Sequence, residues 1–298
     1  MARSDSFTPY DLELAEASLS DPWAHGRLEE PQYVPNYPLL ERLLSIPVET
    51  GKGGTSGALA NGVDSWLAHE LRRCGFSEDE VWPRATRPRI VSRDIAALLK
   101  RLPADLRMAV SDRLLQMPAV APTDARVLGR AYEKQVDVVI SRWERGPELL
   151  LSTKTQVSSF GKNLSNRFEE AYGDAGNLRS RYPLAAIGFF FVQRSTILTE
   201  EPDAFERAVD MMRKLRDPLG VNGYTATGMA LASWDEEERR VRIELDRVPE
   251  DVRPEQFMTK MVAQVLAATP VSQHVKVRSL IERRTIPVRE DDGVTPEQ

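Results

Sequence analysis

The spacing of apolar residues predicts that the first half of the chain is mainly helical. An apolar stripe at the period of one helix face runs through Leu59, Val63, Trp66, Leu67 and Leu71. Two shorter helices are predicted over residues 92–102 and 104–117, separated by Pro103. Ahead of these helices, residues 1–50 are interrupted by prolines and are predicted to form an N-terminal arm.

From residue 133 the pattern changes to that of β-strands. Val136, Val138 and Ile140 alternate in a β-branched run, which is typical of a half-buried strand. A turn over residues 145–147 leads into a second apolar segment that continues to Thr155. The two segments therefore predict a pair of strands joined by a tight turn.

The remaining sequence alternates helices and strands. Residues 164–178 carry an apolar stripe at helical spacing, and residues 184–192 are apolar at consecutive positions, as in a central strand covered on both faces. A helix over 202–216, strands near 224–233 and 239–245, and a helix over 254–268 follow. This order predicts an α/β or α+β fold, in which helices flank a mixed central sheet.

These patterns suggest four parts along the chain. They are an N-terminal arm (1–50), a helical region (51–125), a core of strands and helices (126–250), and a C-terminal helix with a tail (251–298). The chain has 298 residues, which is enough for one large domain or two small ones.

Composition excludes several classes of protein. With 41% apolar and 29% charged residues, the chain has the balance of a soluble globular protein. Its single cysteine, Cys74, and three histidines make a disulfide or a cysteine-based zinc site untenable, so any metal is expected to be bound by oxygen. The net charge of -5 still leaves 40 lysines and arginines for a local basic face. No membrane partner is expected, because the longest apolar run, residues 184–192, is too short to span a bilayer. The single cysteine favours a reducing compartment, so we expect a cytoplasmic protein.

Asp137 and Lys154 are the first candidates for chemistry. Asp137 interrupts an otherwise apolar strand, where an isolated charge is costly unless a partner or a metal compensates it. Lys154 lies at the end of the next strand and shares a face with Ser152. A salt bridge from Asp137 to Arg142 or Arg179 is the structural alternative, and Lys154 could equally be a solvated strand end.

This arrangement resembles the PD-(D/E)xK nuclease superfamily, the fold of many restriction endonucleases, over roughly residues 130–195. The resemblance implies that Asp137 binds a divalent metal, usually Mg²⁺ with Mn²⁺ as a substitute, and that Lys154 assists the attacking water. The middle acidic position of the motif is Ser152 here, which is a departure from the family pattern. Some members carry this SxK variant and recruit a glutamate from the following helix, for which Glu170 is our first choice and Glu169 the second.

Nucleic-acid contacts are expected from two polar sets. The first borders the proposed site and its helix, and consists of Lys162, Asn163, Asn166 and Arg167. The second set lies just before the two short helices and at the start of the first one, and consists of Arg87, Arg89 and Arg93. It makes the region 51–125 a possible DNA-contacting subdomain. A solvated helix face explains this second set equally well.

The resemblance also implies that a further acidic residue can come from the first helix of the fold. Asp64 or Glu70 is the candidate for it.

The resemblance implies a Mg²⁺-dependent endonuclease that hydrolyses DNA phosphodiester bonds, as in type II restriction or phage defence in prokaryotes. Its expected partners are double-stranded DNA, a second copy of the chain in a homodimer, and a cognate methyltransferase or defence-system protein. The alternative is a catalytically inactive nucleic-acid-binding or complex-forming subunit of the same fold, in which Ser152 marks a lost metal site.

Overall fold

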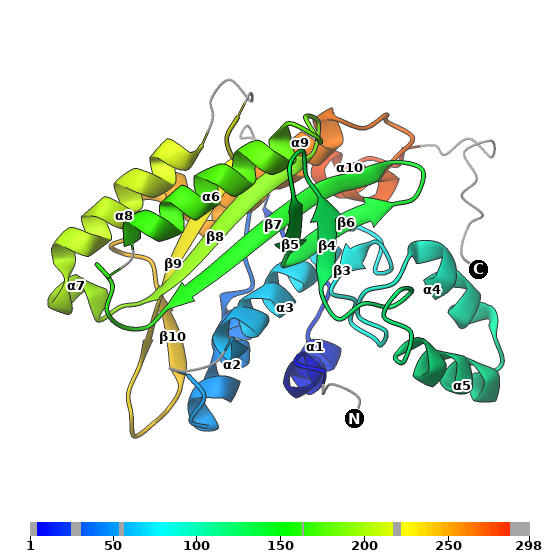
Figure 1. Ribbon diagram of the computed structural model, residues 1–298, viewed down its shortest axis with the longest axis horizontal. Coiled ribbons are helices and arrows are strands. Elements are labelled where there is room, and N and C mark those ends of the chain that lie inside the picture. Colours follow the sequence, from blue (N-terminus) through cyan, green and yellow to red (C-terminus); the bar gives the residue numbers. More distant parts are fainter. Residues whose placement is uncertain (1–4, 25–30, 54–56, 163, 217–221, 287–298) are drawn as a thin grey trace.

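A six-stranded mixed sheet forms the centre of the computed structural model, which describes residues 5–24, 31–53, 57–162, 164–216 and 222–286 (Figure 1). Its strand order is β10-β9-β8-β7-β6-β3. The strands are β3 (Val81–Trp82), β6 (Val138–Arg142), β7 (Gly146–Gln156), β8 (Ala186–Arg194), β9 (Ala226–Trp234) and β10 (Val241–Glu244). The predicted fold class, a mixed central sheet flanked by helices, is therefore confirmed.

Strand β7 is the longest strand and joins the antiparallel and parallel parts of the sheet. It pairs antiparallel with β6 across the turn at Gly146, which adopts a positive φ of 69° that favours glycine. It pairs parallel with β8, and β8 pairs parallel with β9. Its side chains alternate between the two faces of the sheet, so this one strand supplies residues to both layers.

Two layers of helices cover the two faces of the sheet (Figure 1). On one face, Leu149 and Leu151 of β7 join a core with α2 (Tyr37–Glu49), α3 (Ala58–Arg73) and α9 (Pro254–Ala267). On the other face, Leu150 joins a core with α6 (Leu164–Arg179) and α8 (Pro202–Leu215). Burial of both faces explains why β8 is apolar at nearly every position.

The N-terminal segment is more than the arm that we expected. It begins with η1 (Thr8–Tyr10), α1 (Asp11–Glu16) and the short pair β1 (Trp23–Ala24) and β2 (Gln32–Tyr33). Helix α2 then packs into the core through leucines on one face, Leu39, Leu40, Leu43 and Leu44. The Asn36 side chain caps this helix by accepting a hydrogen bond from the Leu39 backbone amide at 3.1 Å. Residues 37–49 are therefore part of the core.

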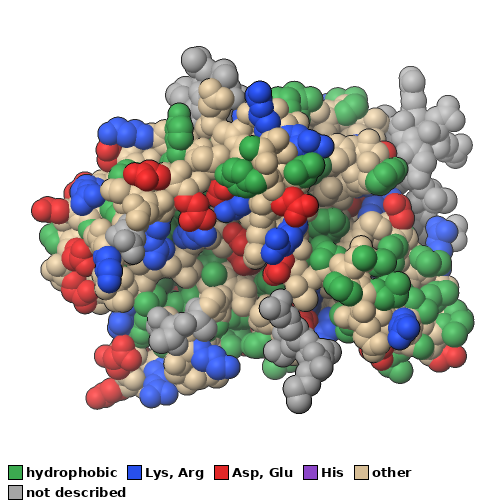
Figure 2. Space-filling model, viewed as in Figure 1, with side chains coloured by type: hydrophobic (Ala, Val, Ile, Leu, Met, Phe, Trp, Pro, Cys, Tyr) green, Lys and Arg blue, Asp and Glu red, His purple; other side chains and the backbone are tan. Residues whose placement is uncertain are grey.

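Helices α4 (Arg93–Arg101) and α5 (Ala104–Leu114) project beside β3, at the end of the sheet opposite β10 (Figure 1). They share a small core of their own, formed by Leu99, Leu114 and Ala121. Their outer surface keeps several apolar side chains exposed, and Figure 2 shows hydrophobic residues gathered over this part of the molecule. The helical character predicted for this region is confirmed.

A second small sheet lies in front of the central one. It consists of β4 (Ala125–Leu128) and β5 (Glu133–Val136), which pair antiparallel. The remaining elements are α7 (Ile197–Glu200), η2 (Glu250–Val252) and α10 (Val275–Glu282). None of the helices in the described ranges is both long and apolar enough to cross a membrane.

Candidate functional site

Asp137 lies at a break between two sheets. The residue before it ends β5, which pairs with β4, and the residue after it begins β6, which pairs with β7. The Asp137 backbone amide donates to the Leu151 carbonyl at 3.0 Å, and its carboxylate oxygen Oδ2 accepts from the Thr153 amide at 2.7 Å. These two hydrogen bonds fix the carboxylate against the middle of β7.

The alternation of β7 places its polar residues on opposite faces. Ser152 and Lys154 face α6 and line a pocket there, as their shared parity predicts. Thr153 faces α3 instead, and its hydroxyl donates to Asp64 Oδ1 at 2.6 Å. Thr153 therefore stands between two carboxylates, binding Asp137 through its amide and Asp64 through its side chain.

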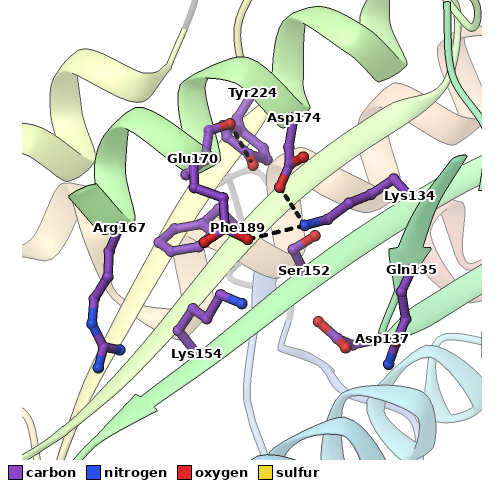
Figure 3. Close-up of a pocket in the computed structure, with 11 residues that line it drawn as sticks. Lys134, Gln135, Asp137, Ser152, Lys154, Arg167, Glu170, Asp174, Phe189 and Tyr224 are labelled. Carbon is purple, nitrogen blue, oxygen red and sulfur yellow. Dashed lines mark hydrogen bonds and ion pairs between the residues drawn. The ribbon is translucent and has the colours of Figure 1, made fainter. Parts of the chain in front are cut away.

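The pocket has a volume of about 250 Å³ and brings together most of the residues predicted for the site (Figure 3). Asp137 comes from the β5–β6 break, Ser152 and Lys154 from β7, and Glu170 from α6. The full lining is Lys134, Gln135, Asp137, Ser152, Lys154, Arg167, Glu170, Ala171, Asp174, Phe189 and Tyr224. Residues from several strands and from α6, separated by up to 90 positions along the chain (Lys134 to Tyr224), thus meet in one pocket.

Helix α6 presents Glu170, and not Glu169, to the pocket. Arg167, Glu170, Ala171 and Asp174 all line it, and their spacing of three, four and seven residues places them on one helix face. Glu169 is exposed and does not belong to the lining. The sequence pattern could not decide between the two glutamates, whereas the helix orientation selects Glu170.

Lys134 and Asp174 are site residues that the sequence analysis missed. The Lys134 ammonium forms ion pairs with the Asp174 carboxylate and with Glu170 Oε1, the latter at 3.5 Å (Figure 3). The Tyr132 hydroxyl also donates to Asp174, at 3.0 Å. The position of Asp174, one helical turn after Glu170, was a usable signal. Nothing in the sequence indicated Lys134, because its placement depends on the bend at Asp137.

The turn of the β4–β5 hairpin is fastened to α6 by Asn177. The Asn177 side-chain oxygen accepts from the Ala131 amide at 2.8 Å, and its nitrogen donates to the Tyr132 carbonyl at 3.0 Å. Gly129 passes so close that a Cβ atom there would lie 2.1 Å from Asn177 Nδ2. The hairpin edge of the pocket is thus positioned by the Asn177 side chain, which leaves no room for a side chain at position 129.

Burial raises the pKa of both carboxylates beside Thr153. For Asp64 the pKa lies well above 3.8, because desolvation is reinforced by the nearby negative charge of Asp137. For Asp137 desolvation raises the pKa more than the hydrogen bond from Thr153 and the charge of Lys154 lower it. Burial therefore destabilises the ionised form of both carboxylates more than the groups around them stabilise it.

Neither Asp137 nor Lys154 forms an ion pair with any residue in the described ranges. The structural alternative of a salt bridge to Arg142 is not observed, since Arg142 pairs with Glu80 at 2.7 Å and with Glu144 at 3.1 Å. Arg179 is buried and donates to the carbonyls of Pro183 and Ala185. Lys154 is half-buried, with its ammonium directed into the pocket (Figure 3).

Of the two acidic residues suggested from the first helix of the fold, only Asp64 lies near the site. Glu70 is buried on α3 and is held by Arg73 at 2.8 Å and by the Tyr33 hydroxyl at 2.7 Å. These partners satisfy Glu70 as a structural ion pair. Asp64 contacts Thr153 behind the strand but does not line the pocket.

The residues predicted to contact DNA fall into two groups. Arg167 lines the pocket, and Lys162 and Asn166 are exposed near it, while Asn163 lies outside the described residues. The arginines before α4 are instead bound to carboxylates, Arg87 to Asp5, Arg89 to Asp5 and Asp11, and Arg93 to Glu80. Arg89 is 7% exposed, so its guanidinium is not presented to a ligand.

The donor atoms of the pocket suit a magnesium ion completed by a substrate. Among the described residues, no group of three histidine, cysteine, aspartate or glutamate side chains is placed to hold a metal. Mg²⁺, however, is commonly held by one or two carboxylates together with substrate phosphates. Asp137 and Glu170 supply two such carboxylates, and Asp137 has no ion pair with a described residue that would compete with a cation. The residues therefore fit a magnesium site that depends on its substrate.

Comparison of the chain with known protein families, with curated proteins and with solved structures finds no match in any of the three. The interpretation of the pocket therefore depends on its own geometry and chemistry.

Proposed function

We propose that this protein is a Mg²⁺-dependent endonuclease that hydrolyses phosphodiester bonds in DNA. One observation carries the proposal: Asp137, Lys154 and Glu170 meet with Ser152 in a single pocket, although they come from separate elements. This is the set of residues that the SxK variant of the PD-(D/E)xK pattern requires.

Each residue of the pocket has a role in this proposal. Asp137 and Glu170 would hold the metal, whose chemistry when bound is to activate water and to stabilise negative charge on the phosphate. Lys154 has no competing ion pair in the described part of the chain, so its ammonium is available to orient the attacking water and to offset the charge of the transition state. Ser152 lines the same pocket from β7, and its hydroxyl can donate a hydrogen bond to a phosphate oxygen.

Arg167 and Lys162 extend the positive surface toward the rest of the DNA backbone. Arg167 lines the pocket from the first turn of α6, and Lys162 precedes that helix and is exposed. A helix N-terminus favours phosphate because its free amides and dipole attract negative charge. These residues would hold phosphates beside the scissile one, with no preference for base sequence.

The cellular role that we propose is restriction or phage defence in prokaryotes. A homodimer would match a two-fold symmetric target, and a cognate methyltransferase or another defence protein would complete the system. Sedimentation analysis of the full chain with and without duplex DNA tests the homodimer.

The decisive experiment is a cleavage assay with a matched pair of variants. The purified full chain is incubated with unmodified and modified plasmid and phage DNA, with and without Mg²⁺. We expect discrete fragments that require Mg²⁺, retained in Asp210→Asn and lost in Asp137→Asn. Asp210 is a suitable control because it is exposed on α8 and pairs only with its helix neighbour Lys214 in the described structure. Equal cleavage by Asp137→Asn would contradict the proposal.

A second candidate function is a nucleic-acid-binding subunit without catalytic activity. It is favoured by the pairing of Glu170 with Lys134 and by the serine at the middle motif position. DNA binding by the wild-type protein that is unaffected by Mg²⁺, with no cleavage of any substrate, is the outcome that selects this candidate.

A further inference from the structure

We propose that Lys134 is a built-in cation that holds the α6 carboxylates of the pocket when no metal is present, and that a divalent metal must displace it from Glu170. This inference rests on the proposed function, because it concerns how the same site takes up its metal. It assigns a regulatory role to a residue that the nuclease pattern does not contain.

The position of the ammonium is the first argument. Lys134 reaches from β5 across the pocket and forms ion pairs with both Glu170 and Asp174 of α6 (Figure 3). Glu170 is the second carboxylate that the metal requires in the proposed function. A glutamate that is already paired with an ammonium has less negative charge to offer a divalent ion, so the two cations compete for it.

The charge balance of the pocket is the second argument. Its lining contains three cationic side chains, Lys134, Lys154 and Arg167, and three anionic ones, Asp137, Glu170 and Asp174. The two sets cancel, so the pocket has no net charge with which to attract a metal ion. Loss of Lys134 alone would leave the lining with one excess negative charge.

The two ion pairs of Lys134 differ in burial, and this difference allows exchange. The Asp174 side chain is 8% exposed, whereas the Glu170 side chain is 56% exposed. The buried pair with Asp174 is the stronger anchor, and the longer, solvated contact with Glu170 is the one that can open. Glu170 can therefore turn to a metal while Lys134 remains on Asp174.

A purely structural role for Lys134 is the competing explanation. The hairpin that carries it is already held to α6 by Asn177 and by the Tyr132 hydroxyl on Asp174. It also buries Val136 and Val127 in the core beneath α6. Attachment of the hairpin does not depend on Lys134 alone, and the two explanations make different predictions for metal affinity.

The test measures Mn²⁺ binding to the full-length protein without DNA, by the loss of the free-ion signal in electron paramagnetic resonance. We expect Lys134→Met to bind Mn²⁺ about tenfold or more tightly than the wild type, because it removes a repelling charge. Lys134→Arg, which keeps the charge, should stay near the wild-type affinity. Lys214→Met, which removes an exposed lysine on α8, should have no effect.

Lys134→Met leaves Asp174 buried without its cation and could therefore fail to fold. A second variant keeps the inference testable in that case. In Lys134→Met/Asp174→Asn both members of the buried pair are neutral, and Glu170 and Asp137 remain. This double variant should also bind Mn²⁺ more tightly than the wild type. Unchanged or weaker binding by the folded variants would overturn the inference and assign Lys134 a structural role.

The failure of this inference can be distinguished from failure of the proposed function. If the wild type binds Mn²⁺ in the presence of a non-cleavable duplex and Asp137→Asn abolishes this binding, the metal site stands whatever Lys134 does. If the wild type binds no Mn²⁺ even with the duplex, and the Lys134 variants bind none either, both proposals are wrong.

Discussion

All four arginines between residues 84 and 93 lie within ion-pair distance of a carboxylate. In the pocket beside α6, by contrast, neither Lys154 nor Asp137 forms an ion pair with a described residue. Arg84 is bound to Asp79 at 2.9 Å, and Arg89 lies 2.8 Å from Asp5. Both regions are rich in charge and both were predicted to contact nucleic acid. The two regions differ in whether their charged side chains already form ion pairs within the folded chain.

This difference separates structural charges from candidate functional ones. A buried ion pair satisfies itself, and removing one member leaves the other uncompensated. A half-buried charge without a partner raises the free energy of the folded state, which a protein tolerates where a ligand will supply the partner. The local density of arginine and lysine, which the sequence displays, does not distinguish the two cases.

The largest effect is expected for Lys154→Met. Cleavage should fall by about 10³-fold, because in the proposed function the ammonium offsets charge in the transition state. The free energy of unfolding should change by less than about 0.5 kcal/mol, since no ion pair with a described residue is lost. The measurements are plasmid cleavage rates and thermal melting, with Lys214→Met as the control. A large loss of stability would place Lys154 among the structural charges and break the comparison.

The next effect separates two adjacent glutamates. Glu170→Gln should lower cleavage about 10²-fold, because it removes a carboxylate that holds the metal in the proposed function. Glu169→Gln changes an exposed side chain outside the lining and should leave the rate within about twofold. The two substitutions are chemically identical and lie one residue apart, so equal effects would contradict the orientation of α6.

Arg89→Met tests the paired region. It removes a buried guanidinium from two carboxylates and should destabilise the fold by about 2 kcal/mol or more. Arg87→Met, at a side chain that is 44% exposed, should cost less than about 1 kcal/mol. Denaturant unfolding measures both values. Unchanged stability of Arg89→Met together with weakened DNA binding would return this residue to the DNA-contacting set.

The smallest effect concerns pH. Burial and the charge of Asp137 raise the pKa of Asp64, so folding favours the protonated side chain. Its stabilising contribution is present below about pH 3.8 and is lost as the pH rises through the folded-state pKa. Asp64→Asn, which resembles the protonated form, should therefore melt above the wild type at about pH 8 in the presence of EDTA. The difference should disappear toward about pH 4, and a difference independent of pH would show that Asp64 is not ionised at the higher pH.

Local rules predicted the part of the site that lies on regular elements. Alternation along a strand placed Ser152 and Lys154 on one face, and the tight turn brought Asp137 beside them. The helix after β7 was also predicted, with a glutamate on it as the displaced ligand. These predictions need only the period of each element and the connection between neighbours.

The rest of the site depends on contacts that local rules do not describe. The strand predicted through Val136 and Ile140 is broken at Asp137, because β5 pairs with β4 and β6 pairs with β7. That break turns Lys134 toward α6, which a continuous strand would not do. Helix α2 was missed for a similar reason, since its burial against β10 is a tertiary contact between distant segments.

The close approach of Gly129 to Asn177 has an evolutionary consequence. A side chain at position 129 would collide with an amide that is held by hydrogen bonds to the hairpin turn. The two positions should consequently change together in any relative that keeps this hairpin, with a larger residue at 129 accompanied by a smaller one at 177. Such paired substitutions would show that natural selection maintains the edge of the pocket, even where the side chains that line it have been replaced.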